Sequence, residues 1–341
     1  MPTQIATTTG VRNTSILGLG VYRPARIVTN DEVAGAIDSS DEWIRTRSGI
    51  KTRRFCGPDE TVLTMSIEAS KDAIEAAGIA PDQVDCVVVA TSTWLLLTPA
   101  AAPQIASGLG MKATAAFDIS AGCAGFCHGV SLAADMVRSG TARHVLVVGV
   151  ERLTDTLDFT DRSTAFLFGD GAGAVVVGPS DANGIGPTVW GSEGESWKAI
   201  RQTKDWMEFF NEIDATGTDA TRPYLTMEGT TVFRWAAHSL EKVCREALDR
   251  AGVTTEQLDA LIPHQANGRI TEVMSRILKL PDDCAVANDI ETSGNTSAAS
   301  IPLAMDTMLR NGEAKAGDTA LLIAFGAGLS YASQVVTLPG L

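Results

Sequence analysis

Three side chains in this sequence could together perform covalent acyl chemistry. The first, Cys123, lies in the small-residue segment A-G-C-A-G, where an apolar strand gives way to a helix. A helix N-terminus carries roughly half a positive charge and unpaired N–H groups that stabilise a thiolate, so we expect a lowered thiol pKa and a nucleophilic sulfur. The second, His264 in L-I-P-H-Q-A-N, directly follows a predicted buried strand, at the end where ligands bind in open α/β sheets. Asn267 adds an amide beside the same opening, where it is expected to contact the substrate.

The third group, Asn295, is indicated by an internal repeat. Two amphipathic helices that end at Gly78 and Gly252 each lead through a short loop into an apolar strand, and the glycines are 252 − 78 = 174 residues apart. A second pair of helices ends at glycines 172 residues apart, Gly140 and Gly312. At that offset Cys123 corresponds to Asn295, and two halves related by a pseudo-twofold axis would bring both residues to one cleft. A Cys, a His and an Asn in one cleft favour an acyl-enzyme mechanism.

The elements that must position these groups alternate between strands and helices, which predicts an α/β fold with mostly parallel, buried strands. Residues 1–14 are expected to form a flexible tail. Residues 15–178 would form the half with the nucleophilic Cys, and residues 179–341 the half with the His and the Asn. The remaining cysteines and histidines are predicted to be structural: Cys56, Cys86, Cys127, Cys244, Cys284, His128, His144 and His238.

Two glycine-rich segments need different interpretations. G-D-G-A-G-A, residues 169–174, precedes a strand instead of opening a helix, which excludes a dinucleotide-binding loop. F-G-A-G-L-S-Y, residues 325–331, follows a buried strand, and its N–H groups could form an oxyanion hole.

Composition excludes several classes of protein. The chain has 341 residues, of which 45% are hydrophobic and 20% charged, as in globular proteins with a large core. A net charge of −14 disfavours binding to nucleic acid or to a membrane surface, so an anionic ligand would need a local group of arginines. No C-x-x-C pair is present, which argues against a structural metal site. The first residues do not resemble a signal peptide, and reduced thiols would fit a cytoplasmic protein.

Six segments in this order resemble motifs of the β-ketoacyl-acyl carrier protein synthase III family of the thiolase superfamily. They are D-E-W-I-R-T-R-S-G-I, A-F-D-I-S-A-G-C-A-G-F, F-G-D-G-A-G-A, H-Q-A-N-x-R-I, S-G-N-T-S-A-A-S-I-P and A-F-G-A-G. The resemblance covers residue 15 to the C-terminus. It implies a duplicated five-layered αβαβα thiolase-like fold, usually a homodimer, and a coenzyme A thioester as substrate with no further cofactor.

The resemblance also implies a role for each site residue. Cys123 would attack an acyl-coenzyme A, with the N–H groups of Cys123 and Ala327 holding the oxyanion. His264 and Asn295 would then stabilise the enolate formed when malonyl-acyl carrier protein loses CO₂, and the carbanion would attack the acyl-cysteine. Phe325 would pack between the nucleophile and the histidine.

Aromatic and basic residues match positions that bind the two carriers of the acyl groups. Trp43 and Arg162 match residues that sandwich the adenine of coenzyme A, and Arg47 matches one that meets its phosphates. Arg269 matches a basic residue that docks the acidic carrier protein, and this basic patch is expected to extend to Arg234 and Arg276.

The sequence departs from many family members at one substrate-binding position. Thr98 aligns with a phenylalanine that reaches across the dimer and limits the acyl pocket, so we expect acceptance of branched or longer primers. The aromatic stretch 197–210 could be a wall of the pocket or a cap on the dimer. Two other functions remain open: transfer of the acyl group to an alcohol, an amine or another carrier, and a non-enzymatic homologue that only binds a carrier protein or acyl chain. The intact Cys–His–Asn set argues for decarboxylative condensation.

Overall fold

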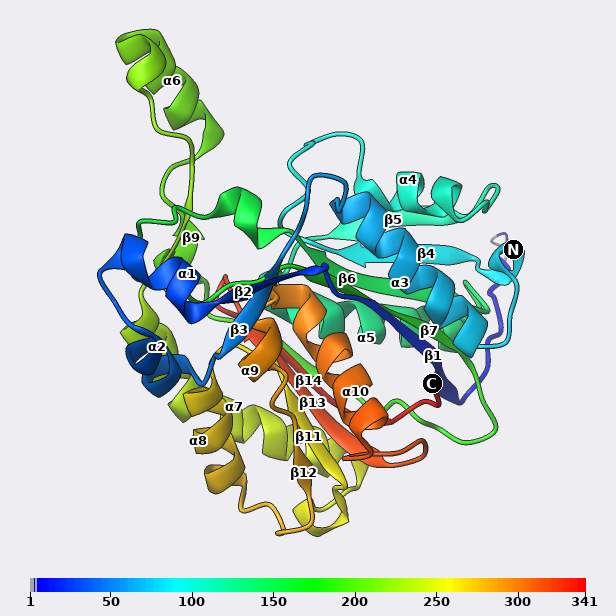
Figure 1. The fold of residues 1–341 in the computed structure, drawn as a ribbon. Helices are drawn as coiled ribbons and strands as arrows, with labels where there is room; N and C mark the ends of the chain where they lie inside the picture. Colours follow the sequence, from blue (N-terminus) through cyan, green and yellow to red (C-terminus); the bar gives the residue numbers. More distant parts are fainter. Residues whose placement is uncertain (1–2, 4) are drawn as a thin grey trace.

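Two five-stranded sheets with the same strand order form the core of the protein (Figure 1). The computed structural model describes residues 3 and 5–341. The first sheet has the order β1 (Thr14–Tyr22), β7 (Gly171–Pro179), β6 (Val145–Glu151), β4 (Cys86–Ala90) and β5 (Ala115–Ile119). The second has the order β8 (Val189–Ser192), β14 (Ser330–Thr337), β13 (Thr319–Gly326), β11 (Ala260–Pro263) and β12 (Ala285–Val286).

The directions of the strands also agree between the sheets. In the first, β6, β4 and β5 run parallel, whereas β7 is antiparallel to its neighbours β6 and β1. In the second, β13, β11 and β12 run parallel, whereas β14 is antiparallel to its neighbours β13 and β8. Equivalent strands therefore appear in the same order along the chain, as the internal repeat predicts.

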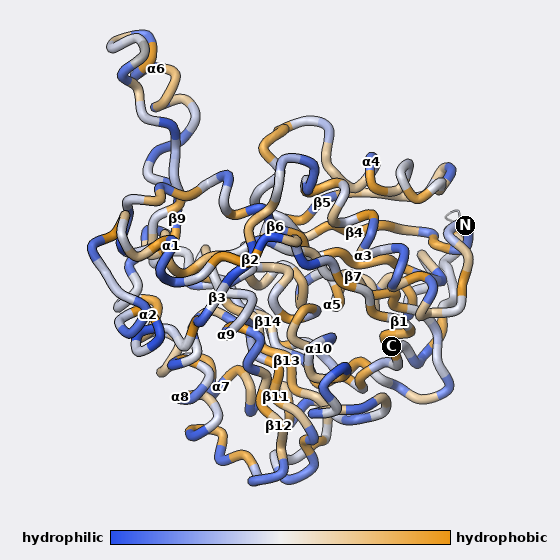
Figure 2. Tube along the Cα trace, viewed as in Figure 1, coloured by the Kyte–Doolittle hydropathy of each residue, from blue (hydrophilic) through white to orange (hydrophobic). Residues whose placement is uncertain are grey.

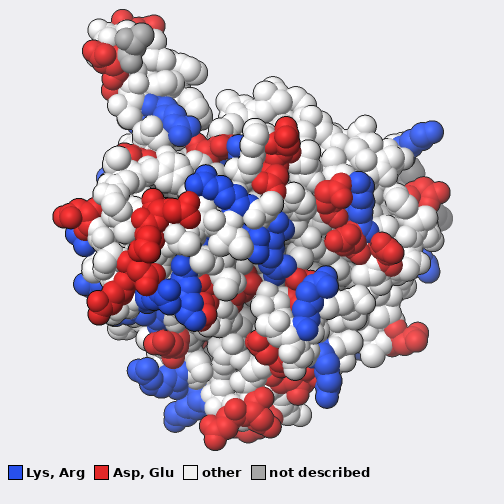
Figure 3. Space-filling model, in the orientation of Figure 1, with Lys and Arg blue, Asp and Glu red and all other residues white. Residues whose placement is uncertain are grey.

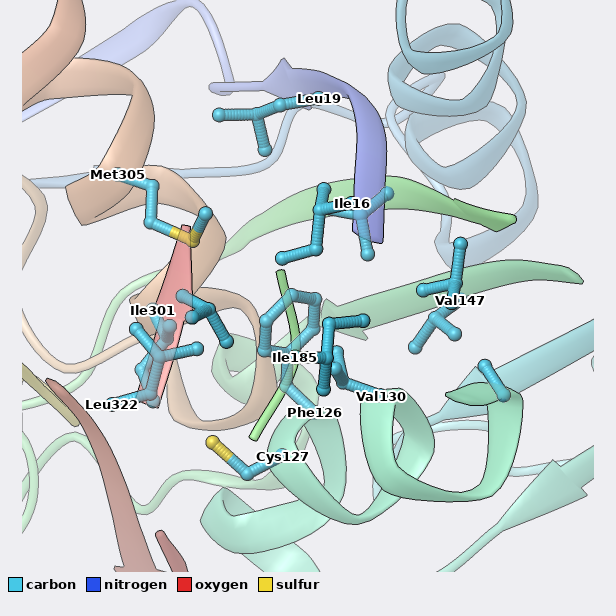
Figure 4. Packing of buried hydrophobic residues seen from close by; sticks show 14 of the residues in the cluster. Ile16, Leu19, Phe126, Cys127, Val130, Val147, Ile185, Ile301, Met305 and Leu322 are labelled. Carbon is cyan, nitrogen blue, oxygen red and sulfur yellow. The ribbon is translucent and has the colours of Figure 1, made fainter. Parts of the chain in front are cut away.

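Helices separate and cover the two sheets. Buried α5 (Gly125–Ser139) and α10 (Ser300–Asn311) lie between them, and Figure 4 shows Phe126 and Val130 of α5 close to Ile301 and Met305 of α10. The outer face of the first sheet is covered by α3 (Val62–Ala76) and α4 (Ala101–Gly108). The outer face of the second is covered by α7 (Gly229–Ala251) and α8 (Gly268–Leu278). The result is the predicted five-layered αβαβα arrangement.

The hydrophobic pattern explains these layers. Strand β4 is buried at every position, as expected for a parallel strand with helices on both faces. The strands of both sheets are predominantly hydrophobic (Figure 2). Gly140 and Gly312 terminate α5 and α10 with φ of 78° and 73°, a conformation that glycine adopts without strain. The helix ends predicted at these glycines are confirmed.

Smaller elements surround one end of the sheets. Strands β2 (Arg26–Thr29) and β3 (Thr52–Phe55) pair, as do β9 (Ile200–Gln202) and β10 (Leu225–Met227). Helix α6 (Trp206–Thr216) projects away from the body (Figure 1). The other α-helices are α1 (Asn30–Ala34), α2 (Asp41–Ser48) and α9 (Ile290–Ser293). Short 3₁₀ turns are η1 (Gly35–Ile37), η2 (Pro81–Gln83), η3 (Gly122–Ala124), η4 (Leu153–Thr156), η5 (Gly194–Ala199), η6 (Gly217–Asp219), η7 (Thr255–Gln257) and η8 (Ser297–Ala299).

The N-terminal segment that we expected to be a flexible tail lies partly outside the described residues, which omit 1, 2 and 4. Within the described part, the Thr8 hydroxyl donates a hydrogen bond to the Ser139 carbonyl at 2.6 Å. Gly10 lies so close to the end of α5 that a Cβ there would stand 2.2 Å from the Arg138 carbonyl oxygen. The segment 8–10 therefore packs against α5, and the flexibility of the tail stays a prediction.

The structure was also searched for disulfides, metal-binding groups and membrane-spanning helices. The six cysteines are all free thiols. Among the described residues, no group of three or more His, Cys, Asp or Glu side chains could hold a metal ion. Within that same part of the chain, no helix combines the length and the hydrophobicity needed to cross a membrane.

Candidate active site

A cleft of about 1090 Å³ brings together the three groups predicted to perform chemistry. Cys123, His264 and Asn295 all line it, although they come from separate parts of the chain. Cys123 lies on η3, just before α5; His264 follows β11; and Asn295 lies between α9 and η8. The cleft therefore receives one residue from the first sheet's half and two from the second's.

The backbone at Cys123 lies against the end of β13. A Cβ built on Gly326 would stand 2.7 Å from the Cys123 Cβ and 3.0 Å from both its backbone nitrogen and its Sγ. The next residue, Ala327, approaches Gly122 closely, since a Cβ on Gly122 would stand 3.3 Å from the Ala327 nitrogen. The N–H groups of Cys123 and Ala327, the two predicted oxyanion donors, thus lie on two segments that pack against each other.

This close approach predicts the effect of a Gly326→Ala substitution. The added methyl would displace Cys123 or the β13 end, and we expect turnover to fall by about 10²–10³-fold, the loss typical of one misplaced oxyanion donor. Steady-state turnover and the melting temperature should be measured together. Gly35→Ala is the matched control, because a Cβ at Gly35 meets nothing within 4 Å and its φ of −63° suits alanine. Full activity of Gly326→Ala would contradict this geometry.

The thiol of Cys123 does not have the lowered pKa that its place before a helix suggested. Its pKa is raised to about 12, chiefly by burial; Ser297 and the backbone N–H of Cys123 oppose this rise, and the nearby Glu151 carboxyl adds to it. The prediction of a lowered pKa is wrong because desolvation outweighs the partial charge at the helix start. The thiol is therefore neutral in the resting site and needs a proton acceptor to react.

His264 is held as a neutral imidazole. Its side chain is 2% exposed, and burial lowers its pKa to about 3. Nδ1 lies 2.6 Å from the Ser300 hydroxyl, which also accepts a hydrogen bond from the Gln265 N–H at 3.3 Å. Since the Ser300 hydroxyl proton has no other acceptor among the hydrogen bonds of the described residues, we assign it to Nδ1. This network leaves a proton on Nε2, as a donor toward the cleft.

Asn295 has its carboxamide oriented by the turn that follows. Its Oδ1 accepts a hydrogen bond from the Ser297 N–H at 2.9 Å, so Nδ2 is the free end of the amide, with only a long 3.5 Å contact to the Ala266 carbonyl. The backbone of Asn295 bonds to Leu167 and Gly169 of the other half of the chain. The segment L-F-G, residues 167–169, thus holds the backbone of the amide donor in place.

Phe325 packs against His264, one of the two groups that it is predicted to separate. Its buried ring meets the His264 ring edge to face, with centroids 5.3 Å apart and an interplanar angle of 71°. The contact holds the imidazole in one orientation beside the end of β13.

At the outer part of the cleft, two arginines lie against one indole. The Arg162 guanidinium is 4.6 Å from the Trp43 ring centroid and that of Arg47 is 5.7 Å away. Phe166 supports the indole from its edge, with centroids 5.2 Å apart. A base between Trp43 and Arg162 would need about 7 Å, twice a normal contact distance, so Arg162 must move aside to form the predicted sandwich.

Asn267 lines the cleft, and each end of its amide makes one hydrogen bond. Oδ1 accepts from the Arg269 N–H at 3.0 Å and caps α8, while Nδ2 donates to the Arg47 carbonyl at 3.0 Å. These bonds connect Asn267 to the segment that carries Arg47 and leave a second N–H and a second lone pair on the amide, so its contact with substrate stays a prediction.

The predicted carrier-protein patch lies on α7 and α8. The Arg269 guanidinium packs over Phe233 at 5.4 Å, next to Arg234 in the chain. Arg276 is seven residues after Arg269, which places both on one face of α8, about 10 Å apart along the helix. Of the three arginines, Arg269 lines the cleft, whereas Arg234 and Arg276 are exposed outside it.

Thr98 is exposed and does not line the cleft of its own chain. Leu95 and Leu97 from the same loop do, and both are exposed. The aromatic stretch 197–210 contributes Trp206 to the cleft wall, whereas Trp197 is exposed and lies outside the lining. The stretch is therefore in part a wall of the pocket.

Sequence reasoning missed the polar residues behind the three groups. Ser300 orients His264, and Ser297 orients Asn295. Glu151, at the end of buried β6, accepts a hydrogen bond from Ser297 at 3.1 Å. A signal for Glu151 was present, since an acidic residue at the end of the apolar run V-L-V-V-G-V-E is unusual in a buried strand.

Comparison with known proteins identifies the family. Residues 117–194 match the model of 3-oxoacyl-[acyl-carrier-protein (ACP)] synthase III, and residues 248–338 match the model of its C-terminal part. The chain is 55% identical over 337 residues to a mycobacterial β-ketoacyl-[acyl-carrier-protein] synthase III of Mycobacterium marinum, covering 99% of both chains. It is 57% identical over 324 residues to a synthase III of Streptomyces glaucescens, covering 95% of this chain and 96% of the relative.

Solved structures agree with this assignment. The priming β-ketosynthase of the R1128 polyketide biosynthetic pathway superposes with a TM-score of 0.93 at 47% identity, covering 100% of this chain and 99% of that one. The synthase III of Aquifex aeolicus gives a TM-score of 0.85 at 38% identity, covering 95% and 100%. With the duplicated fold and the cleft described above, these matches show that the chain belongs to the β-ketoacyl-[acyl-carrier-protein] synthase III family of the thiolase superfamily.

Proposed function

We propose that this enzyme loads an acyl group from acyl-coenzyme A onto Cys123 and condenses it with malonyl-acyl carrier protein. The products are a β-ketoacyl-acyl carrier protein, CO₂ and coenzyme A. The observation that carries the proposal is the meeting, in one cleft, of a cysteine beside two backbone N–H groups and of two side-chain N–H donors from the other half. Membership of the synthase III family supports the same reaction.

In the first step, the Cys123 sulfur attacks the thioester carbon and coenzyme A leaves. Negative charge develops on the carbonyl oxygen, which the N–H groups of Cys123 and Ala327 are placed to accept. Each such donor stabilises the transition state by about 2.7–4 kcal/mol in comparable sites. Both donors are backbone groups, so no side chain has to reorganise as the charge forms.

In the second step, His264 Nε2 and Asn295 Nδ2 bind the malonyl thioester oxygen. Loss of CO₂ places negative charge on that oxygen, and both hydrogen bonds strengthen as it becomes an enolate. The lowered pKa of His264 suits this role, because a neutral imidazole donates from Nε2 at any pH above about 3. The carbanion then attacks the acyl-cysteine.

The proposed substrates enter from the basic side of the cleft. Trp43, Arg47 and Arg162 would bind the nucleotide of coenzyme A, since an indole and two guanidinium groups offer both stacking and positive charge. Arg269, with Arg234 and Arg276, would attract the acidic carrier protein to α7 and α8. Figure 3 shows acidic and basic side chains interspersed over the rest of the visible face, so such a local cluster matters for a chain of charge −14.

A homodimer is proposed on the exposed edge of the first sheet. Strand β5 is only half-buried at four positions and exposed at Ala115, whereas its neighbour β4 is fully buried. An edge strand with apolar residues is a template for pairing with a second copy. In such a dimer the exposed Thr98 loop would meet the partner, as its predicted effect on the acyl pocket requires.

Two further predictions from the sequence concern the organisation of the chain and the compartment in which the protein acts. We propose that 15–178 and 179–341 are two copies of one unit, because their strands share order and direction. The six free thiols would suit a reducing, cytoplasmic compartment.

Intact-mass analysis after incubation with a mixture of acyl-coenzyme A primers tests the first step. We expect a single acyl adduct on Cys123, and we expect branched or longer primers to compete with acetyl because Thr98 is small. Release of CO₂ on adding malonyl-acyl carrier protein tests the second step. An adduct without CO₂ release, giving an ester or an amide when an alcohol or an amine is supplied, would instead support transfer to another acceptor. A protein that forms no adduct would fit a non-catalytic homologue.

A further inference from the structure

Arg53 is a fully buried arginine that does not line the cleft and has no role in the steps above. It lies on β3 and is 0% exposed. An arginine stays protonated in proteins, and a buried charge normally has a charged partner. Among the described residues, however, Arg53 forms no salt bridge. Its guanidinium binds uncharged oxygens instead, and the segments that supply these oxygens indicate what the side chain does.

Three oxygens accept hydrogen bonds from the guanidinium. Nη2 donates to Asn30 Oδ1 at 2.5 Å and to the Phe166 carbonyl at 2.9 Å, and Nη1 lies 3.3 Å from the Val28 carbonyl. Val28 belongs to the neighbouring strand β2 and Asn30 begins α1, whereas Phe166 lines the cleft. Arg53 therefore connects the wall of the cleft to the small elements behind it.

The first branch of this network leads through Asn30 to α2. The Asn30 side chain is buried, and its Nδ2 donates to Asp41 Oδ1 at 2.7 Å and to the Ile50 carbonyl at 2.8 Å. Asp41 begins α2 and Ile50 lies two residues beyond its end. A single amide, itself held by Arg53, thus fixes both ends of the helix that carries Trp43.

The second branch leads through the Phe166 carbonyl to both ends of the cleft. The Phe166 ring meets the Trp43 indole edge to face, with centroids 5.2 Å apart. The backbone of the next residues, 167–169, forms hydrogen bonds of 2.9 and 3.0 Å with the backbone of Asn295. The carbonyl that Arg53 binds therefore lies between the support of the indole and the support of the amide donor.

The aliphatic part of Arg53 packs against the same support. A Cβ built on Gly294, the residue before Asn295, would stand 2.9 Å from the Arg53 Cβ. A Cβ built on Gly169 would stand 3.3 Å from the same atom. Both the stem and the guanidinium of Arg53 thus lie behind the segments that hold Asn295.

We propose that Arg53 is a positioning residue that holds Trp43 and Asn295 in place relative to each other and so serves both steps of the reaction. The proposal rests on the function proposed above, in which the indole stacks on the nucleotide of coenzyme A and the amide donates to the enolate. Arg53 acts through Asn30 and the Phe166 carbonyl and touches no substrate.

The shape of the guanidinium gives the physical reason. Its planar fork donates in several fixed directions at once, whereas a lysine presents a single nitrogen. Loss of the fork would leave the Phe166 carbonyl and Asn30 Oδ1 without this donor in a buried site, and the segments that carry them would shift to recover a partner. Such a shift would move Trp43 and Asn295 together.

The experiment uses Arg53→Met, which keeps the stem and removes the guanidinium. For acyl loading, kcat/KM with acyl-coenzyme A should fall about tenfold, the effect of weakening a stack on an aromatic ring. Loading from the matching acyl-pantetheine, which lacks the nucleotide, should stay within about twofold, because Cys123 is not part of this network. Release of CO₂ from malonyl-acyl carrier protein should fall about 10²-fold, as for a catalytic group misplaced by about 1 Å.

Two further variants separate the branches. Asn30→Ala cuts only the branch to α2, so it should slow loading from acyl-coenzyme A and leave CO₂ release within about twofold. Arg53→Lys keeps the charge and one donor nitrogen, and both activities should lie between those of wild type and Arg53→Met. Melting temperatures are measured for all variants. If Arg53→Met does not fold, the contrast between Arg53→Lys, which affects both activities, and Asn30→Ala decides the proposal.

Arg54→Met is the matched control. Arg54 is the next residue of β3, donates to the Pro24 carbonyl at 3.0 Å and does not line the cleft. Its loss should leave CO₂ release and the ratio of the two loading reactions within about twofold. Equal losses with acyl-coenzyme A and acyl-pantetheine in Arg53→Met, or unchanged CO₂ release, would overturn the positioning role. Absence of loading in wild type would instead refute the proposed function.

Discussion

A Cys123→Ala protein is expected to gain no mass from any acyl-coenzyme A, yet to keep releasing CO₂ from malonyl-acyl carrier protein. The sulfur forms the only covalent bond in the proposed loading step, so the loss should be complete. The donors proposed for decarboxylation, His264 and Asn295, hold their positions through Ser300 and Ser297, not through the thiol. Intact mass and CO₂ release, measured on the same sample, check both halves of this result.

Cys127→Ala is the control for that experiment. Cys127 is 0% exposed and lies four residues further on, within α5. Its replacement should reduce stability slightly and leave loading intact, because Cys127 packs in the buried cluster between the two sheets (Figure 4) and does not line the cleft. If an acyl adduct persisted in Cys123→Ala, or disappeared in Cys127→Ala, Cys123 would not be the acylated nucleophile.

Removal of either enolate donor, His264 or Asn295, is expected to preserve acyl loading and to impair condensation. His264→Ala and Asn295→Ala should each form the acyl-enzyme at nearly the wild-type rate, because neither side chain belongs to the oxyanion pair of Cys123 and Ala327. Condensation should fall by about 10²–10³-fold in each, the loss typical of one donor to a developing oxyanion. Single-turnover loading and CO₂ release separate the two steps.

His144→Ala serves as the matched control for this pair. His144 is a buried histidine, 6% exposed, that hydrogen-bonds to the Gln83 carbonyl and does not line the cleft. Its loss should lower the melting temperature and leave both steps unchanged. If His264→Ala or Asn295→Ala failed to load an acyl group while remaining folded, the proposal that these two residues act only in the second step would be wrong.

The Asn295→Ala variant also distinguishes decarboxylative condensation from transfer of the acyl group to another acceptor. Transfer of the acyl group to an alcohol or an amine needs no enolate, so it would survive in Asn295→Ala. Decarboxylative condensation would not, because the charge on the thioester oxygen would lose one of its two proposed donors. The acceptor class can therefore be read from a single variant.

Much of the fold was predictable because it depends on local patterns. Helices end where glycines such as Gly140 and Gly312 supply a left-handed conformation, and buried parallel strands appear as uninterrupted apolar runs. The repeat of these patterns predicted two equivalent layers of sheet, and the order of the strands confirms it. The protrusion of α6 was not predicted, since its amphipathic sequence is equally typical of a packed helix.

The sequence by itself determined which residue types could react and that two copies of one pattern would bring Cys123 and Asn295 to equivalent places. The tertiary structure alone decided their chemical state. Burial holds the Cys123 thiol protonated and keeps His264 neutral, because desolvation depends on every atom packed around a group. Likewise the free end of the Asn295 amide depends on Ser297, whose hydroxyl bonds to Glu151 of β6, 146 positions earlier in the chain.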